Sequence, residues 1–173
     1  YVGRTGTVDG DGWAVFGLFY YNMATPDSTC IGLIPQFSGS IVVKNIAMSE
    51  VYIKTNADSR GSANNVYSGC IFGMGSDSYG MYSNMYGPAD TVGDQINGNA
   101  LPRFENIMID HTCYISSGNA AGLGNPGGAA IVINNCISTG TFECDDAPDR
   151  TGALGGNQWS HGSRHYNSIG FTQ

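Results

Sequence analysis

Two carboxylates near the start of the chain have a spacing that could bind a metal ion. Asp9 and Asp11 lie in an Asp-Gly-Asp-Gly run, and carboxylates two residues apart can share one calcium ion. No Glu follows about six residues later to complete an EF-hand loop, since Ala14, Val15 and Phe16 occupy that region. A plain turn is therefore favoured over a site. We expect no cofactor, and Ca²⁺ at Asp9 and Asp11 is the alternative.

Histidine and acidic side chains occur in two further arrangements that could support catalysis or metal binding. His161 and His165 are four residues apart, but Gly162 lies between them and no helix pattern aligns them, which favours a solvated loop. Asp110 and His111 suggest general acid–base chemistry, but the alternation of a strand would place them on opposite faces. No catalytic residue is assigned, and the sequence leans against an enzyme.

A long segment at residues 76–100 interleaves Tyr and Met with Gly and Ser. Loops on a rigid scaffold often carry binding residues, and Tyr with Ser, Gly and Asn makes adaptable contacts to sugars or proteins. The alternative is a loop that folds back over its own aromatic residues. The candidate ligand-binding residues are Asp77, Tyr79, Tyr82, Tyr86 and Asp90.

The composition predicts strands and turns to position these residues. The chain has 173 residues, enough for one domain, with 26 Gly, only 12% charged residues and few of the usual helix formers. A net charge of −7 with seven basic residues argues against nucleic acid or an anionic membrane as a partner. No apolar run is long enough to span a membrane. Because the chain begins at Tyr1 without a Met, we expect a processed protein or a piece of a longer one.

A strand pattern at residues 40–53 returns twice further along the chain. Asn45, Asn106 and Asn135 each follow β-branched or aromatic residues and precede an apolar residue, and 29 positions separate the last two (135 − 106). Gly32 precedes Asn45, and Gly122 precedes Asn135, by the same thirteen positions. A period near 29 without helical periodicity is typical of a β-solenoid, whose coils stack about 4.8 Å apart.

The repeat predicts which side chains stack in successive coils. Asn45, Asn106 and Asn135 should form a ladder at a bend, because Asn tolerates left-handed backbone and its amide can bond along a stack. Two columns are expected in the core, namely Ile46 with Ile107 and Cys136, and Tyr52 with Tyr114 and Phe142. A β-sandwich or jelly roll remains the alternative.

We therefore expect an all-β fold, a parallel β-solenoid of about five coils in one domain over residues 1–173. Residues 1–29 would be an N-terminal strand or cap, with the apolar run at 13–21 as a core strand or part of the cap. Residues 30–75 and 101–173 would form the coils, and residues 76–100 an inserted loop.

Five Cys in a Gly-rich, Lys-poor chain suggest an oxidising, extracellular setting. Cys30 and Cys70 precede Ile in equivalent strands, so adjacent coils would bring their Cα atoms within the range of a disulfide. Cys113 and Cys144 could form a second bridge. Cys136 would be the odd, buried thiol.

Several segments resemble the GLUG-type (Gly-Leu-rich repeat) β-solenoid modules of bacterial surface proteins and, more loosely, the pectin-lyase-like right-handed β-helices. The residues that carry the resemblance are Ile31-Gly32-Leu33-Ile34, Ser40-Ile41-Val42-Val43-Lys44-Asn45-Ile46, Ala121-Gly122-Leu123-Gly124, Ala130-Ile131-Val132-Ile133-Asn134-Asn135-Cys136 and Gly152-Ala153-Leu154-Gly155-Gly156. The resemblance implies a right-handed β-helix in an extracellular, mostly non-catalytic module used in adhesion or surface structures.

Together these patterns predict a non-catalytic structural module at the cell surface, a subunit of a filament or adhesin. A solenoid has unpaired strand edges at both ends, so the expected partners are copies of itself or neighbouring domains of a longer polypeptide. The alternative is a carbohydrate-binding or polysaccharide-degrading β-helix that uses the 76–100 loop. An ice-binding solenoid is a third possibility.

Overall fold

The computed structural model is built from β-strands and turns. It describes residues 5–23, 29–38, 40–55, 66–76, 95–96, 99–126, 131–144, 151–156 and 164–171. Within these ranges there is no helix, and so none that could cross a membrane. The strands pair in parallel in every sheet except a short antiparallel pair, β10 (Gln95–Ile96) with β11 (Asn99–Ala100).

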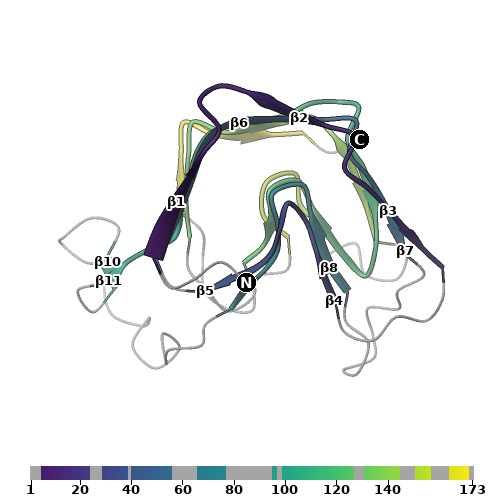
Figure 1. Cartoon of the computed structure of the whole chain (residues 1–173), viewed down its shortest axis with the longest axis horizontal. Coiled ribbons are helices and arrows are strands. Elements are labelled where there is room, and N and C mark those ends of the chain that lie inside the picture. The colour runs from purple at the N-terminus through teal and green to yellow at the C-terminus, as the bar shows by residue number, and fades with distance from the viewer. Residues whose placement is uncertain are drawn as a thin grey trace.

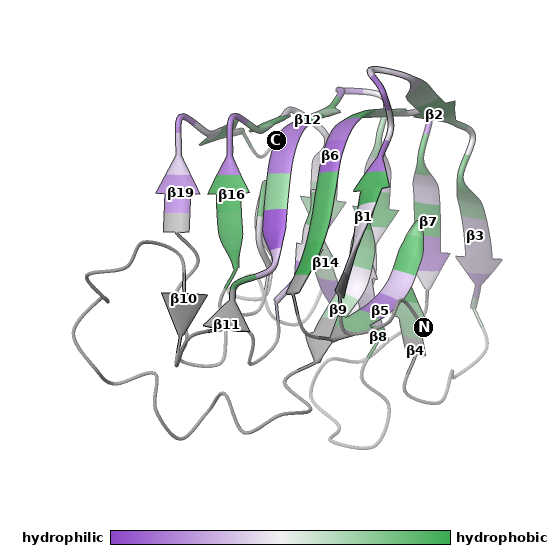
Figure 2. Ribbon diagram, turned by 60° about the vertical axis from the view of Figure 1, so that its left-hand side comes forward, coloured by the Kyte–Doolittle hydropathy of each residue, from purple (hydrophilic) through white to green (hydrophobic). Residues whose placement is uncertain are grey.

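The largest sheet has eight parallel strands and contains all three repeated Asn segments. Its central path runs β1 (Thr5–Asp9), β6 (Ser40–Ser49), β12 (Arg103–Ile109), β16 (Val132–Asn134) and β19 (Arg164–Tyr166). Three short strands extend it, β2 (Ala14–Phe16) beside β6, β17 (Ile137–Ser138) beside β12 and β20 (Ile169–Gly170) beside β17. Figure 2 shows the strands of the central path side by side.

Three smaller parallel sheets complete the fold. The second sheet contains β3 (Phe19–Asn22), β7 (Tyr52–Thr55), β13 (Tyr114–Ser116) and β18 (Thr141–Glu143). The third contains β4 (Thr29–Ile31), β8 (Val66–Gly69) and β14 (Asn119–Ala121). The fourth contains β5 (Ile34–Ser38), β9 (Phe72–Ser76) and β15 (Gly124–Asn125).

The chain visits the four sheets in the same order again and again, and we call each round a pass. Pass 1 is residues 5–38, pass 2 is 40–76, pass 3 is 103–125, pass 4 is 132–155 and pass 5 is 164–171. In pass 4 isolated bridges at Gly152 and Gly155 take the place of the last two strands. Viewed along the stack, corresponding strands such as β3 and β7, or β4 and β8, overlap (Figure 1).

These sheets confirm the expected all-β class with parallel pairing. The four sheets are separate from one another in their hydrogen bonding, so they do not by themselves establish a closed right-handed β-helix. Of the expected inserted loop at residues 76–100, residue 76 is the last of β9, and only residues 76, 95–96 and 99–100 are among those described.

The core lies between the sheets and is built from like positions of successive passes. The register places Ile107 opposite Ile46. It also places Met108 opposite Ile137, so the residues that precede them, Ile107 and Cys136, lie side by side. Ile46, Ile107 and Cys136 therefore form one buried column, as expected. Three fully buried rings from passes 1 to 3, Phe37, Phe72 and Phe104, pack with centroids 4.6–5.6 Å apart.

The second expected core column is wrong. Tyr52 pairs with Tyr114, but both rings point away from the core and are only partly buried. Phe142 instead pairs with Ile115, which pairs with Ile53, and these three are the buried residues. Tyr52 stacks between Phe19 and Tyr114 with centroids 5.5 Å apart on each side, so the outer face carries an aromatic row of its own.

Candidate functional site

Three Asn side chains from successive passes form a hydrogen-bonded ladder at one corner of the stack. Asn106 Nδ2 donates to Asn45 Oδ1 at 2.9 Å, and Asn135 Nδ2 donates to Asn106 Oδ1 at 2.7 Å. All three have positive φ, 56°, 52° and 52°, a conformation that Asn adopts more readily than most residues. Asn167 has the same left-handed backbone in pass 5. The corner therefore needs Asn for both its backbone and its amide.

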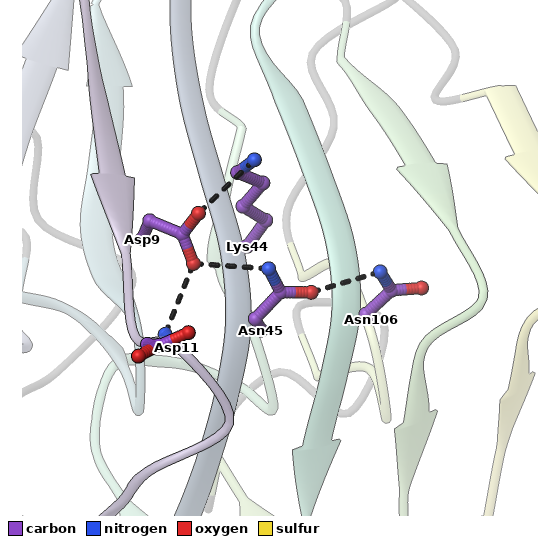
Figure 3. A network of polar contacts seen from close by, with 5 residues as sticks. All are labelled: Asp9, Asp11, Lys44, Asn45 and Asn106. Carbon is purple, nitrogen blue, oxygen red and sulfur yellow. Dashed lines mark hydrogen bonds and ion pairs between the residues drawn. The ribbon is translucent and has the colours of Figure 1, made fainter.

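Asp9 ends this ladder in pass 1 (Figure 3). Its Oδ1 accepts hydrogen bonds from Asn45 Nδ2 at 2.9 Å and from the Asp11 backbone N–H at 3.0 Å, and Lys44 Nζ lies 3.0 Å from its Oδ2. The Asp11 N–H, the Asn45 amide and Lys44 together hold the pKa of Asp9 at about 2. Both carboxylate oxygens thus already have partners, one of them a cation, which is the arrangement of a turn.

Neither Asp9 nor Asp11 has a third acidic, His or Cys neighbour with which to hold a metal ion, and the described residues contain no such group of three elsewhere. Calcium at this turn stays a prediction from the sequence.

The lowered pKa of Asp9 predicts a pH dependence. In the unfolded chain the carboxyl should titrate near its usual value of 3.8, so its contribution to stability is present above that pH and is lost as the pH falls towards about 2. We expect an NMR titration of the Asp9 carboxyl carbon to give a midpoint near 2 in the folded protein. Lys44→Met should raise it, whereas Lys54→Met, on β7, should not. A wild-type midpoint at 3.8 would contradict the hydrogen bonding described.

A shallow groove of about 430 Å³ lies beside the ladder on the outer surface. Its lining combines one carboxylate, two amides and apolar side chains, from Asp11, Gly12, Asn45, Ile46, Ala47, Asn106 and Met108. These groups could hydrogen-bond and pack against a small polar molecule. The lining contains no nucleophile and no His or Cys, so the groove is suited to binding rather than to reaction.

The Asp110–His111 pair lies at the next corner, where Asp110 has a structural set of partners. Its carboxylate accepts hydrogen bonds from Ser49 Oγ at 2.7 Å and from the Thr112 N–H at 2.9 Å. Partial burial raises the pKa of Asp110, but these hydrogen bonds outweigh it and the net shift is downward. A carboxylate held ionised cannot serve as a general acid at neutral pH.

The remaining ionisable candidates are divided between described and undescribed parts of the chain. His165 lies in β19, and burial lowers its pKa, whereas His161 lies outside the described residues. The candidate ligand-binding residues of the inserted loop also lie outside them, namely Asp77, Tyr79, Tyr82, Tyr86 and Asp90.

The cysteines do not form the expected disulfides, and all five are free. The expected equivalence of Cys30 and Cys70 is wrong, since the β4–β8 register sets Cys30 opposite Tyr67. Cys30 and Cys70 are thus three residues out of register (70 − 67). Cys113 and Cys144 are also apart. The Cys113 carbonyl accepts a hydrogen bond from the Thr141 N–H, at the start of β18. Cys144 follows the other end of β18, where its thiol donates to the Gly118 carbonyl.

A feature that the sequence did not predict is the distribution of exposed apolar side chains. Eleven large ones are exposed among the described residues; six are in pass 1 and three in pass 5. They are Trp13, Phe16, Phe19, Tyr21, Met23, Leu33, Met108, Ile137, Tyr166, Ile169 and Phe171. The run at 13–21, expected as a core strand or a cap, is thus largely an exposed surface, with Trp13 76% and Phe19 70% accessible.

Comparison with protein-family models, with curated proteins and with solved structures gives no match for this chain. The functional argument therefore depends on the residues and geometry above.

Proposed function

We propose that this chain is a non-catalytic structural module, a parallel right-handed β-solenoid of about five coils whose ends pack against further copies of itself. The observation that carries the proposal is the position of the exposed apolar side chains. Nine of the eleven belong to pass 1 or pass 5, the two ends of the stack. Exposed apolar groups gathered in this way are typical of surfaces that bind other proteins.

The strand edges at the same two ends support this proposal. In the described sheets β1, β3, β4 and β5 each pair on one side only, with a pass 2 strand. At the other end β19, β20 and β18 likewise have one neighbour each. An unpaired strand edge offers backbone N–H and C=O groups to another strand. Apolar side chains beside such an edge would add burial to backbone pairing.

The charged groups of the described strands also fit a structural role. Asp9 pairs with Lys44, and the Arg103 Nε lies 2.7 Å from Glu105 Oε1. The Tyr114 hydroxyl donates to Glu143 Oε2 at 2.7 Å. These contacts occupy the carboxylates with neighbouring protein groups.

The GLUG-type resemblance and the extracellular or cell-surface location belong to the same proposal. An exported structural module would be recovered from the medium or the cell envelope. Fractionation of the native source, with an antibody against this chain, tests the location; recovery only from the cytosol would contradict it.

Self-association is the prediction that tests the proposed function. Sedimentation velocity should show species larger than the monomer that increase with protein concentration. The double variant Phe19→Ser with Tyr21→Ser removes two exposed apolar side chains from β3. It should need a protein concentration at least tenfold higher than the wild type to reach the same degree of association. Both side chains are more than half exposed, so the fold should be retained, as circular dichroism can check.

The matched control is Met108→Ser with Ile137→Ser, which removes the two exposed apolar residues that lie away from the ends. This variant should associate as the wild type does. A protein that stays monomeric at all concentrations, or equal effects of the two double variants, would contradict association through the ends.

A further inference from the structure

Two tyrosine rings from consecutive passes stack on the outer face of the second sheet. Tyr52 in β7 of pass 2 and Tyr114 in β13 of pass 3 are paired in parallel register. Their ring centroids are 5.5 Å apart and the ring planes are inclined by 23°. Both rings are partly exposed, whereas the residues that follow them, Ile53 and Ile115, are fully buried. Two phenol rings therefore lie face to face at the surface.

Backbone hydrogen bonds fix the positions of both tyrosines. The Tyr52 N–H donates to the Leu18 carbonyl at 2.8 Å, and the Tyr114 N–H donates to the Val51 carbonyl at 2.8 Å. β7 is paired with β3 on one side and β13 on the other, and β13 is paired with β7 and β18. Because both strands lie inside the sheet, the fold holds together two rings that a long chain segment would keep apart in the unfolded state.

The Tyr114 hydroxyl has a proton acceptor. It donates to Glu143 Oε2 at 2.7 Å, from β18 of pass 4. Burial and the Glu143 carboxylate raise the pKa of Tyr114, so the phenol is protonated at neutral pH. One-electron oxidation of a phenol releases its proton, and a carboxylate already hydrogen-bonded to the hydroxyl can receive that proton. Tyr114 is therefore suited to oxidation.

The other members of the same outer row cannot couple with either phenol. Phe19 stacks on the other face of Tyr52 but has no hydroxyl, and Thr141 lies on the other side of Tyr114. Tyr21, two residues after Phe19, is 57% exposed and lies opposite Lys54. Within this row, two phenols are neighbours only at Tyr52 and Tyr114.

We propose that Tyr52 and Tyr114 are an oxidative cross-linking site, at which a peroxidase and hydrogen peroxide join the two rings as dityrosine and so link pass 2 covalently to pass 3. The inference is independent of the proposed self-association, because both tyrosines belong to inner passes of one chain.

The chemistry is the coupling of two phenoxyl radicals. The peroxidase takes one electron from each phenol, and each hydroxyl loses its proton, that of Tyr114 to Glu143. A carbon–carbon bond then forms between the ring carbons next to the two hydroxyl-bearing carbons. Each coupled carbon loses its hydrogen as a proton, and each phenoxyl oxygen regains one. Two C–H bonds are thus replaced by one C–C bond, and the two hydrogen atoms reduce one hydrogen peroxide to two waters.

The test is to treat the dilute protein with peroxidase and hydrogen peroxide, isolate the single chain under denaturing conditions and map its peptides. The expected result is a chain lighter by two hydrogen atoms, with dityrosine fluorescence and a cross-linked peptide pair that contains Tyr52 and Tyr114. The same treatment in urea, which removes the stacking, should lower the yield of this peptide pair about tenfold.

Three single variants separate the pair from tyrosine oxidation in general. Tyr52→Phe and Tyr114→Phe keep the stacked rings but should each abolish the cross-link within the chain. Tyr21→Phe is the matched control, since it removes a more exposed phenol of the same sheet and should leave the yield unchanged. Glu143→Gln keeps a hydrogen-bond acceptor that cannot take up the proton, and it should slow the coupling.

A single chain without dityrosine, a cross-link between other tyrosines, or dityrosine found only between chains would overturn the proposal. An unchanged rate in Glu143→Gln would overturn the proton transfer to Glu143. The peptide map of the wild type decides the site even if a variant fails to fold. Because the cross-link is measured within single denatured chains, its failure would leave the proposed function standing.

Discussion

Phe104→Ala is expected to lower the free energy of unfolding by about 3–5 kcal/mol. The Phe104 ring lies 4.6 Å from Phe72 and 5.6 Å from Phe37, centroid to centroid, and all three rings are fully buried. They come from three consecutive passes, so truncation removes contacts that hold the passes together. The strand of Phe104, β12, and the strand of Phe72, β9, are each hydrogen-bonded to neighbours on both sides, which limits collapse into the cavity. Urea denaturation followed by fluorescence and circular dichroism measures the loss.

Met108→Ala is the matched control because Met108 lies on the same strand and is 48% exposed. Its truncation should cost less than about 1 kcal/mol. Phe104→Leu, which keeps much of the apolar volume, should fall between the two. Equal losses for Phe104→Ala and Met108→Ala would show that the aromatic cluster is not the centre of the core.

The repeated Asn residues could be identified from the sequence because two physical demands act on the same position. The corner needs a left-handed backbone, and the stack offers each amide a donor below and an acceptor above. Few residues meet both demands, so Asn45, Asn106 and Asn135 occur at like positions with an apolar residue after each. The parallel pairing of the strands follows from this alignment.

The aromatic column could not be aligned from the sequence because the corners differ in length. In pass 2, three residues lie between Met48 and Tyr52. In pass 3, four residues lie between Ile109, the partner of Met48, and Tyr114, the partner of Tyr52. Only two separate Ser138 from Thr141 in pass 4. A fixed offset from the Asn therefore reaches an outward Tyr in one pass and the inward Phe142 in another.

The same effect explains the wrong cysteine alignment. Two residues separate Ile31 from Ile34, whereas three separate Ser68 from Phe72 at the same turn of the next pass. Cys30 precedes this turn and Cys70 lies within it, although both precede an Ile. Corner lengths depend on tertiary packing, which local residue types do not specify.

The exposed run at 13–21 was missed for a different reason. Its nearly continuous apolar residues would be suitable for a core strand inside the stack, and the residues alone do not reveal that pass 1 has a neighbour on one side only. Which pass is terminal is a property of the whole fold.

Asn125→Leu is expected to lower the free energy of unfolding by about 2–5 kcal/mol, although the two side chains have similar volumes. Asn125 is fully buried in β15, and its Nδ2 donates to three backbone carbonyls, those of Ser68 at 3.0 Å, Asn119 at 3.2 Å and Gly73 at 3.3 Å. Leu would leave these carbonyls buried with fewer donors, and an unsatisfied buried acceptor costs about 1–3 kcal/mol.

Asn135→Gly is the matched control, because it removes an amide from the exposed ladder while keeping the left-handed backbone that residue 135 requires. It should cost less than about 1 kcal/mol, since water can replace the lost partner of Asn106. Both losses are measured by urea denaturation at neutral pH. If Asn125→Leu proved as mild as Asn135→Gly, the inner amide would be no more important to stability than the exposed one. A clearly larger loss would show that the buried amide, which links strands of passes 2 and 3, stabilises the stack from inside while the ladder mainly sets the shape of its corner.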